Sequence, residues 1–334
     1  MKHLVFSIFL FIAAPLFAQT AHETAFSFMK TGDHDNAILV LNKALQTSPE
    51  DEQLLQDIAL AYYYKKDFAQ ARVYSKKLID RDEVDVMSYQ IAGTVFRALE
   101  EVKEADKMYR KALKKYPASG ALYNEFGEML WAKNDESAIT FWEKGIEADP
   151  SYAGNYYNAS TYYFFTKDKV WSIIYGEIFV NMEYLTERAT EVKKQLLTAY
   201  KEKIFLNNSE EAKPKTPFAS AVHETLNKQS SLTAKGLTVE TLTMIRTRFI
   251  LDWYAKYGAK FPLRLFDYQQ QLLRAGMFEA YNQWLFGPVE NLAYFDQWTR
   301  TNAEAYKKFI NFQKNRVFKM PPNQFYGDKE ARKA

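Results

Sequence analysis

The sequence predicts an all-α protein built from pairs of short helices, and three observations lead to this prediction. A pattern of small and large apolar residues returns about every 34 residues through the first half of the chain. No useful length of the sequence alternates between apolar and polar residues with the period of two that half-buried strands show. The 334 residues include only 12 glycines and 10 prolines, so turns are few for a chain of this length.

The first residues have the pattern of a secretory signal peptide. Lys2 precedes an apolar run from Leu4 to Ala14, and Leu16-Phe17-Ala18 ends in a small residue before Gln19. The apolar run is about half of the roughly 20 residues that a membrane-spanning helix needs. We expect residues 1–18 to be removed and the mature protein to be exported to the periplasm or cell exterior, without a transmembrane segment. An uncleaved membrane anchor is the alternative.

Four stretches of the first half share the recurring pattern. The third is the most complete, with Tyr89, Ala92, Gly93, Phe96, Ala105, Tyr109, Ala112 and Pro117. The fourth follows it with Tyr123, Phe126, Gly127, Leu130, Ala138, Trp142, Gly145 and Pro150. The first, beside the predicted cleavage point, has Ala25, Phe28, Gly32, Ala37, Leu41, Ala44 and Pro49. The second has Leu55, Ile58, Ala59, Tyr62, Ala71 and Leu78 but lacks the final proline.

The chemistry of these positions suits pairs of closely packed helices. Ala105, Tyr109 and Ala112 are four and three residues apart, so they lie on one face of a helix. Small residues at such positions let two helix backbones approach, and the large ones fill the space around the contact. Pro117 cannot continue a helix and marks the end of the unit.

The spacing of these residues resembles the tetratricopeptide repeat, whose unit is about 34 residues long. The resemblance implies two antiparallel helices in each unit and a superhelix of about four to five stacked pairs. We assign residues 19–206 to this solenoid and its capping helix.

A fifth unit begins with Tyr156, Ala159 and Tyr163, but its second helix departs from the pattern. Trp171, Tyr175 and Phe179 are spaced at i, i+4 and i+8 and form an apolar stripe of their own, which indicates contact with something other than another repeat. We expect the next helix, over about 183–206, to cap the last repeat with its apolar residues Leu185, Val192, Leu196, Leu197 and Tyr200.

The second half has a different character. Residues 207–217 are polar and contain two prolines, which predicts a linker. Periodicity then predicts aromatic-rich helices over 218–229, 238–257, 262–285 and 289–316, with a break at Gly287-Pro288. We assign 218–320 to a helical C-terminal region, which carries no family signature that we recognise, and 321–334 to a tail.

Composition and motifs give little support to catalysis or to nucleic-acid binding. The formal charge is only +3, with a mildly acidic front and a mildly basic back, and there is no cysteine. Apart from His3 in the leader, the histidines are His22, His34 and His223, and no two have the spacing of helical metal ligands. Glycine-rich phosphate loops and nucleophile elbows are missing from the sequence. We therefore expect no metal, cofactor or nucleic acid.

The resemblance to tetratricopeptide repeats also implies which residues line a concave groove, because the first helix of each unit faces it. Carried over by the alignment of the units, the predicted groove residues are Gln56, Leu60, Tyr63, Gln90, Thr94, Arg97, Asn124, Glu128, Trp131, Tyr157, Thr161 and Phe164. Rings would bury area and amides would bond backbone groups of an extended peptide or a helix. The alternative is that some of these rings pack inside the protein.

The function that the sequence favours is a non-enzymatic scaffold of the cell envelope, which binds a protein or peptide in the groove. Two alternatives stay open. One is an enzyme with a carboxylate-based site in the C-terminal helical half. The other is a protein that binds anionic polymers or lipid headgroups through its basic C-terminal half. The partner and the oligomeric state do not follow from the sequence.

Overall fold

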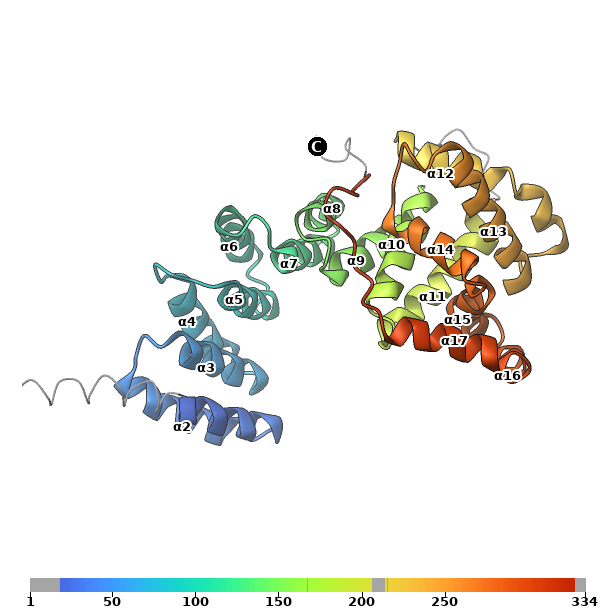
Figure 1. Ribbon diagram of the computed structural model, residues 1–334. Helices are drawn as coiled ribbons and strands as arrows, with labels where there is room; N and C mark the ends of the chain where they lie inside the picture. The colour runs from blue at the N-terminus through green and yellow to red at the C-terminus, as the bar shows by residue number, and fades with distance from the viewer. Residues whose placement is uncertain (1–18, 167, 206–213, 215, 328–334) are drawn as a thin grey trace, which may run out of the picture. The chain divides into compact units, whose positions relative to one another are not determined.

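The computed structural model describes residues 19–166, 168–205, 214 and 216–327, which form helices with no strand among them. The all-α prediction is therefore confirmed (Figure 1). The predicted leader over 1–18 and most of the predicted linker over 207–217 lie outside the described residues. The chain divides into two compact units, one up to Met129 and one from Leu130 onward.

The first compact unit consists of the helix pairs that the sequence predicts. The helix over residues 19–30 and α2 (His34–Thr47) form the first pair. The following helices are α3 (Glu52–Tyr64), α4 (Phe68–Ile79), α5 (Val86–Ala98), α6 (Val102–Lys115) and the beginning of α7 (Gly120–Trp131). From α2 to α6 each helix packs on the next, and α3 also packs on α5, so the first helices of these consecutive pairs lie side by side.

The small residues of the pattern are contact points between helices. Ala37, Ala59, Ala71 and Ala105 are almost completely buried. A Cβ atom added to Gly93 on α5 would overlap the hydroxyl of Tyr109 on α6. Any larger side chain at position 93 would therefore push the two helices of this repeat apart.

The turn between the two helices of each repeat has the same backbone in four successive copies. Gly32, Lys66, Glu100 and Asn134 follow one another at the repeat spacing, and all four have a left-handed φ between 57° and 79°. This conformation is free of steric strain for glycine and costs other L-residues about 1 kcal/mol or more. Only the first copy has the residue that the turn prefers.

The second compact unit contains the rest of the solenoid and the C-terminal region. It begins with the end of α7, followed by α8 (Ala138–Ala148), α9 (Ala153–Phe165), α10 (Lys169–Met182) and α11 (Glu187–Ala199), which continues as a π-helical turn (Tyr200–Ile204). The C-terminal helices are α12 (Pro217–Asn227), a 3₁₀ turn (Ser230–Lys235), α13 (Val239–Lys256), α14 (Arg264–Arg274), α15 (Phe278–Glu290), α16 (Leu292–Thr301) and α17 (Ala303–Lys314).

Helix α10, which carries the unusual apolar stripe, is buried on all sides. All residues from Val170 to Asn181 are buried, and α10 packs on α9, α11, α12 and α14. Trp171 stacks on Phe218 of α12 with ring centroids 5.5 Å apart. The second helix of the fifth repeat therefore meets the C-terminal region through Trp171, as the stripe predicts. Tyr175 and Phe179 of the same stripe pack instead on Tyr156 and Tyr157 of α9.

The predicted capping helix is present but is not an outer layer. Val192, Leu196, Leu197 and Tyr200 are buried, whereas Leu185 is 85% exposed because it precedes the first residue of α11. Helix α11 packs on α10 with one side and on α15 with another. The apolar periodicity correctly located the helix, but the prediction for Leu185 was wrong.

A buried ion pair joins the fifth repeat to the C-terminal helices. Arg246 of α13 pairs with Glu177 of α10, and the two side chains are 2% and 3% exposed. The hydroxyl of Tyr281 and the amide of Gln269 donate to Glu177 Oε1 over 2.7 and 2.6 Å. Arg246 also donates to Asn282 Oδ1 over 2.7 Å. Both charges are thus paired and hydrogen-bonded, which buried charges require.

Three predictions about helix boundaries in the C-terminal region were wrong. The expected helix over 262–285 is broken into α14 and α15 at Gly276, whose φ of +66° ends α14. The expected break at Gly287-Pro288 does not occur, because α15 continues through Pro288 to Glu290. The expected helix over 289–316 is divided into α16 and α17 by Asn302.

Lys193 explains how α15 tolerates its proline. Pro288 has no N–H to donate to the carbonyl of Trp284, four residues earlier. Lys193 Nζ of α11 donates to this carbonyl over 3.1 Å, and the ammonium lies 3.8 Å from the centre of the Trp284 ring. Burial lowers the pKa of Lys193 to about 8. A side chain from a neighbouring helix thereby replaces the missing backbone donor.

The described part of the tail packs against the protein. Tyr326 stacks on Phe218 with ring centroids 4.5 Å apart, and its hydroxyl donates to the carbonyl of Pro262 over 2.7 Å. Gln324 accepts a hydrogen bond from the backbone N–H of Arg264. Residues up to 327 thus return from α17 to α12 and α14. Among the described residues, no helix has the length and apolarity to cross a bilayer.

We expect Glu100→Gly to stabilise the first compact unit by about 0.5–1 kcal/mol, because glycine relieves the left-handed backbone at position 100. Glu104→Gly is the matched control, since it removes the same exposed charge from the first turn of α6, where φ is helical and glycine costs about 1 kcal/mol. Urea denaturation followed by circular dichroism measures both. Equal destabilisation by the two substitutions would contradict the account of the turn.

We expect Lys193→Met to cost about 1–3 kcal/mol, because it leaves the Trp284 carbonyl buried without a donor. The cost should be smaller in a Pro288→Ala background, where the helix supplies its own N–H. Tryptophan fluorescence during urea unfolding measures this double-mutant cycle. Equal costs in the two backgrounds would show that Lys193 does not replace the helical donor.

The same variant should change the pH dependence of stability. The unfolded chain keeps the Lys193 proton to about pH 10.5, whereas the folded protein releases it near pH 8. Unfolding therefore takes up a proton in this window, and stability rises with pH. Between pH 8 and 9.5 the free energy of unfolding of the wild type should rise relative to that of Lys193→Met by roughly 1 kcal/mol per pH unit. A difference between the two proteins that does not change with pH would contradict the lowered pKa.

Candidate partner-binding surface

The predicted groove residues divide between the two compact units. Eight of them are on the first helices α3, α5 and α7 of the first unit: Gln56, Leu60, Tyr63, Gln90, Thr94, Arg97, Asn124 and Glu128. Trp131, at the end of α7, and Tyr157, Thr161 and Phe164, on α9, belong to the second unit. Each set is described separately below.

The polar residues of the first set link consecutive first helices. Gln56 is buried and donates to Asp85 Oδ1 and Ser88 Oγ at the start of α5 over 3.1 and 3.0 Å. One repeat later, Gln90 donates to Glu125 over 2.7 Å, and Arg97 donates to Glu128 over 3.0 Å. These side chains therefore already bond the neighbouring repeat.

Asn124 and Glu125 continue this polar row on α7. Asn124 is buried and donates to Glu128 on the next turn over 2.8 Å. Burial raises the pKa of the Glu125 carboxyl, and the hydrogen bonds from Gln90 and Tyr109 partly oppose this rise. Tyr109 donates to Glu125 over 3.1 Å, so this carboxylate also joins α6 to α7.

The remaining members of the first set are partly exposed. Leu60 packs on the buried cluster of Leu55, Ala59, Leu78 and Ile91. The ring of Tyr63 contacts Phe68, with centroids 5.7 Å apart, and Thr94 is half-buried. The partial exposure of Leu60 matters most, because its free side faces a cavity.

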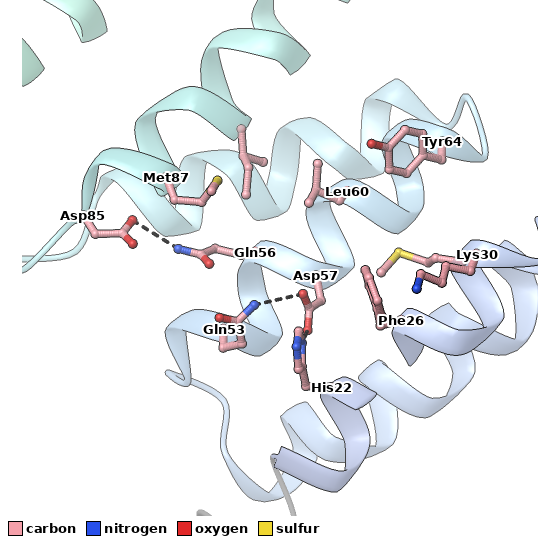
Figure 2. Close-up of a pocket in the computed structure, with 12 residues that line it drawn as sticks. His22, Phe26, Lys30, Gln53, Gln56, Asp57, Leu60, Tyr64, Asp85 and Met87 are labelled. Carbon is pink, nitrogen blue, oxygen red and sulfur yellow. Dashed lines mark hydrogen bonds and ion pairs between the residues drawn. The ribbon is translucent and has the colours of Figure 1, made fainter. Parts of the chain in front are cut away.

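A pocket of about 580 Å³ is formed by the helix over 19–30, α3 and the first turns of α5 (Figure 2). Its apolar lining consists of Phe26, Met29, Leu60, Tyr64, Met87 and Ile91. The large side chains Phe26, Tyr64 and Met87 are 48%, 55% and 51% exposed. The volume lies within the range of about 300–1,000 Å³ that small-molecule and cofactor sites usually have.

A histidine–carboxylate pair forms the polar wall of the pocket. His22 Nδ1 lies 2.6 Å from Asp57 Oδ2, and Gln53 donates to Asp57 Oδ1 over 3.1 Å. Burial raises the pKa of the Asp57 carboxyl, while the contacts with His22 and Gln53 act in the opposite direction. This pair fixes the helix over 19–30 to α3 and so holds the pocket open between them.

Gln56 and Leu60, which the sequence analysis predicted as groove residues, line this pocket, but the sequence analysis did not name the pocket residues of the first repeat. His22, Phe26 and Met29 occupy the positions one repeat of about 34 residues before Gln56, Leu60 and Tyr63. Subtracting one repeat length from the predicted groove positions would have identified these three residues. Asp57, Met87 and Asp85 lie beside the predicted positions, and only the folded structure shows that they reach the cavity.

The members of the second set have contacts within the second compact unit. Trp131 is 41% exposed, and its ring lies 5.5 Å from that of Tyr162. Tyr157 packs on Phe179 at 5.2 Å, with the guanidinium of Arg188 5.1 Å from its ring. Thr161 donates to the carbonyl of Tyr157 over 3.0 Å, and Phe164 packs on Phe165 at 5.2 Å. Tyr157 is therefore used mainly in internal packing.

The alternative of a carboxylate-based enzyme directs attention to the acidic and histidine side chains. That alternative predicts two facing carboxylates in the C-terminal half. The buried carboxylate that these helices contact is Glu177 of α10, and it is paired with Arg246. His223, the histidine of this region, contacts the amide of Asn227. Within the described ranges, no three His, Cys, Asp or Glu side chains are arranged to hold a metal ion.

Comparison with known proteins agrees with the repeat pattern. Residues 25–51 and 88–119 match tetratricopeptide repeat families. No curated protein matches the chain. Among solved structures, YrrB, a TPR protein with an unusual peptide-binding site, is 18% identical, with 55% of this chain and 100% of YrrB covered and a TM-score of 0.40.

Two further solved structures match this chain with similar identity, coverage and TM-score. A thermophilic TPR protein from Thermus thermophilus is 13% identical over 54% of this chain and 98% of its own, with a TM-score of 0.44. MamA from Desulfovibrio magneticus RS-1, from residue 41 to its end, is 16% identical over 51% of this chain and 97% of its own, with a TM-score of 0.41.

Proposed function

We propose, since the chain is a tetratricopeptide repeat protein, that it is a non-enzymatic scaffold that binds a protein or peptide partner on the first helices of its repeats. The fold supports a role in protein–protein interaction. The observation that carries the proposal is the pocket of about 580 Å³ with Phe26 and Met87 exposed at its mouth. Large apolar side chains around a concavity are typical of binding sites.

The location of the binding surface follows from how the repeats use their polar residues. Gln56, Gln90 and Arg97 bond the next repeat, so a partner would have to break those contacts to use them. At the pocket, by contrast, large apolar groups are exposed. Burying them against a partner would contribute about 25 cal/mol per Å² of apolar area removed from water.

The test of this proposal uses charged substitutions inside and outside the pocket. Phe26→Glu and Met87→Glu place a carboxylate at the apolar mouth, and Leu39→Glu on α2 and Val73→Glu on α4 are controls with 68% and 56% exposure. Partners captured by the mature chain from an envelope extract are identified, and the affinity of the purified partner is then measured by calorimetry.

The pocket variants should lose tenfold or more in affinity, which is at least about 1.4 kcal/mol, and the controls should stay within twofold. Melting temperatures should be unchanged, because all four positions are exposed. A loss shared by the controls, or no loss in the pocket variants, would overturn the proposal.

We also propose that the protein acts in the cell envelope after export. The support is the sequence pattern of Lys2, the apolar run to Ala14 and the small residue Ala18. Expression in a Gram-negative host should give a mature protein that begins at Gln19 and is released with the periplasmic fraction. N-terminal sequencing checks this, and a cytoplasmic product that retains Lys2 and His3 would contradict it.

A further inference from the structure

The charged groups of the pocket are distributed unequally between its two ends. Figure 2 shows Asp85, which caps α5, and Met87 of α5 at one end, and Tyr64 with Lys30 at the other. Asp57 lies between them and is bonded to His22 and Gln53. The two ends therefore present opposite charges to anything that enters the cavity.

Asp85 is an exposed carboxylate with an oxygen available to a partner. The backbone N–H of Ser88 and the amide of Gln56 both donate to its Oδ1, over 2.7 and 3.1 Å. Its Oδ2 accepts no hydrogen bond from the described residues. These bonds fix the orientation of the carboxylate at the start of α5, so that a partner would not have to order it.

Three acidic residues near Asp85 are already paired with basic ones. Glu50 pairs with Lys77, Glu52 lies near Arg81, and Glu83 pairs with Lys115. All three cations come from the second helices α4 and α6 or from the residues that follow α4. Asp85 lines the pocket, and no Lys or Arg of the described chain forms an ion pair with it. A cation from outside is the group that would complement it.

The opposite end of the pocket disfavours a cation. The ammonium of Lys30 lies 4.8 Å from the centre of the Phe26 ring. A second positive charge at this end would be repelled, whereas one beside Asp85 would be attracted. A bound segment with one basic residue would therefore have a preferred direction along the pocket.

The apolar part between the two ends suits a large side chain. Met29 and Met87 are unbranched and polarizable, and such side chains adapt to aromatic rings and contact them favourably. Phe26 supplies a ring face on the same side as Lys30. The cavity therefore favours an aromatic anchor over a small or polar one.

We propose that the pocket binds a peptide segment in which a bulky aromatic residue lies close in sequence to a lysine or arginine. The aromatic side chain occupies the apolar part, and the basic group bonds Asp85 Oδ2. The inference rests on the proposed function of the same surface and adds the chemistry of the segment that it recognises.

The test uses the mature chain and short labelled peptides, each with a single Trp and with Lys, Gln or Glu within a few residues of it. Fluorescence anisotropy at low ionic strength gives the affinities. Lys-containing peptides should bind about three- to fivefold more tightly than those with Gln, the range expected for an exposed ion pair. Peptides with Glu should bind more weakly still. The preference should shrink as salt is raised.

Asp85→Asn is the decisive variant, because asparagine still caps α5 and still accepts the bonds of Gln56 and Ser88. It should abolish the preference for Lys over Gln. Asp51→Asn is its matched control: Asp51 caps α3 one repeat earlier, accepts a hydrogen bond from the N–H of Leu54 and does not line the pocket. That variant should keep the preference.

The outcomes separate this inference from the function on which it rests. If Phe26→Glu and Met87→Glu weaken both the peptides and the captured partner, and Asp85→Asn removes the Lys preference, both proposals stand. If these pocket variants weaken the partner but Asp85→Asn leaves the preference unchanged, or no preference exists, only the basic-residue inference fails. If the pocket variants weaken neither, both proposals fail.

Discussion

The close approach of neighbouring helices at small residues is the constraint on which the structure depends. None of the short helices can bury its apolar face alone, so each must pack on the next. Gly93 lies directly under the hydroxyl of Tyr109, and a Cβ atom on Gly176 would meet Ser160, Leu196 and Val192. Because the spacing of small and large residues repeats, each pair presents to the next pair the surface that the previous pair presented to it.

Stacking also determines which polar residues remain available. In the first compact unit, Gln56, Gln90 and Arg97 point along the row of first helices and are used by the next repeat. The pocket beside the helix over 19–30 is different, because its edge combines exposed apolar side chains with the free oxygen of Asp85. A surface built from equivalent positions thus contains both residues that bond the next repeat and residues that line a pocket.

The solenoid ends where a buried ion pair takes the place of contacts between repeats. Its fifth repeat puts Glu177 where it meets Arg246, Gln269 and Tyr281 of the C-terminal helices. Removing two charges from water is costly, and the cost is offset only when every partner is in place. The arrangement therefore favours one docking of α10 against α13, α14 and α15 over other apolar contacts.

The sequence by itself determined the helix pairs, their order, the departure of the fifth repeat and two of the pocket residues, Gln56 and Leu60. These features depend on periodicity, which is local and is written along the chain. The tertiary structure decided which polar groups meet: Gln56 with Asp85, 29 residues away, and Glu177 with Tyr281, 104 residues away. It also decided that α15 continues through Pro288, because the compensating donor, Lys193, comes from another helix. Such pairings depend on how helices are placed in space, which periodicity does not specify.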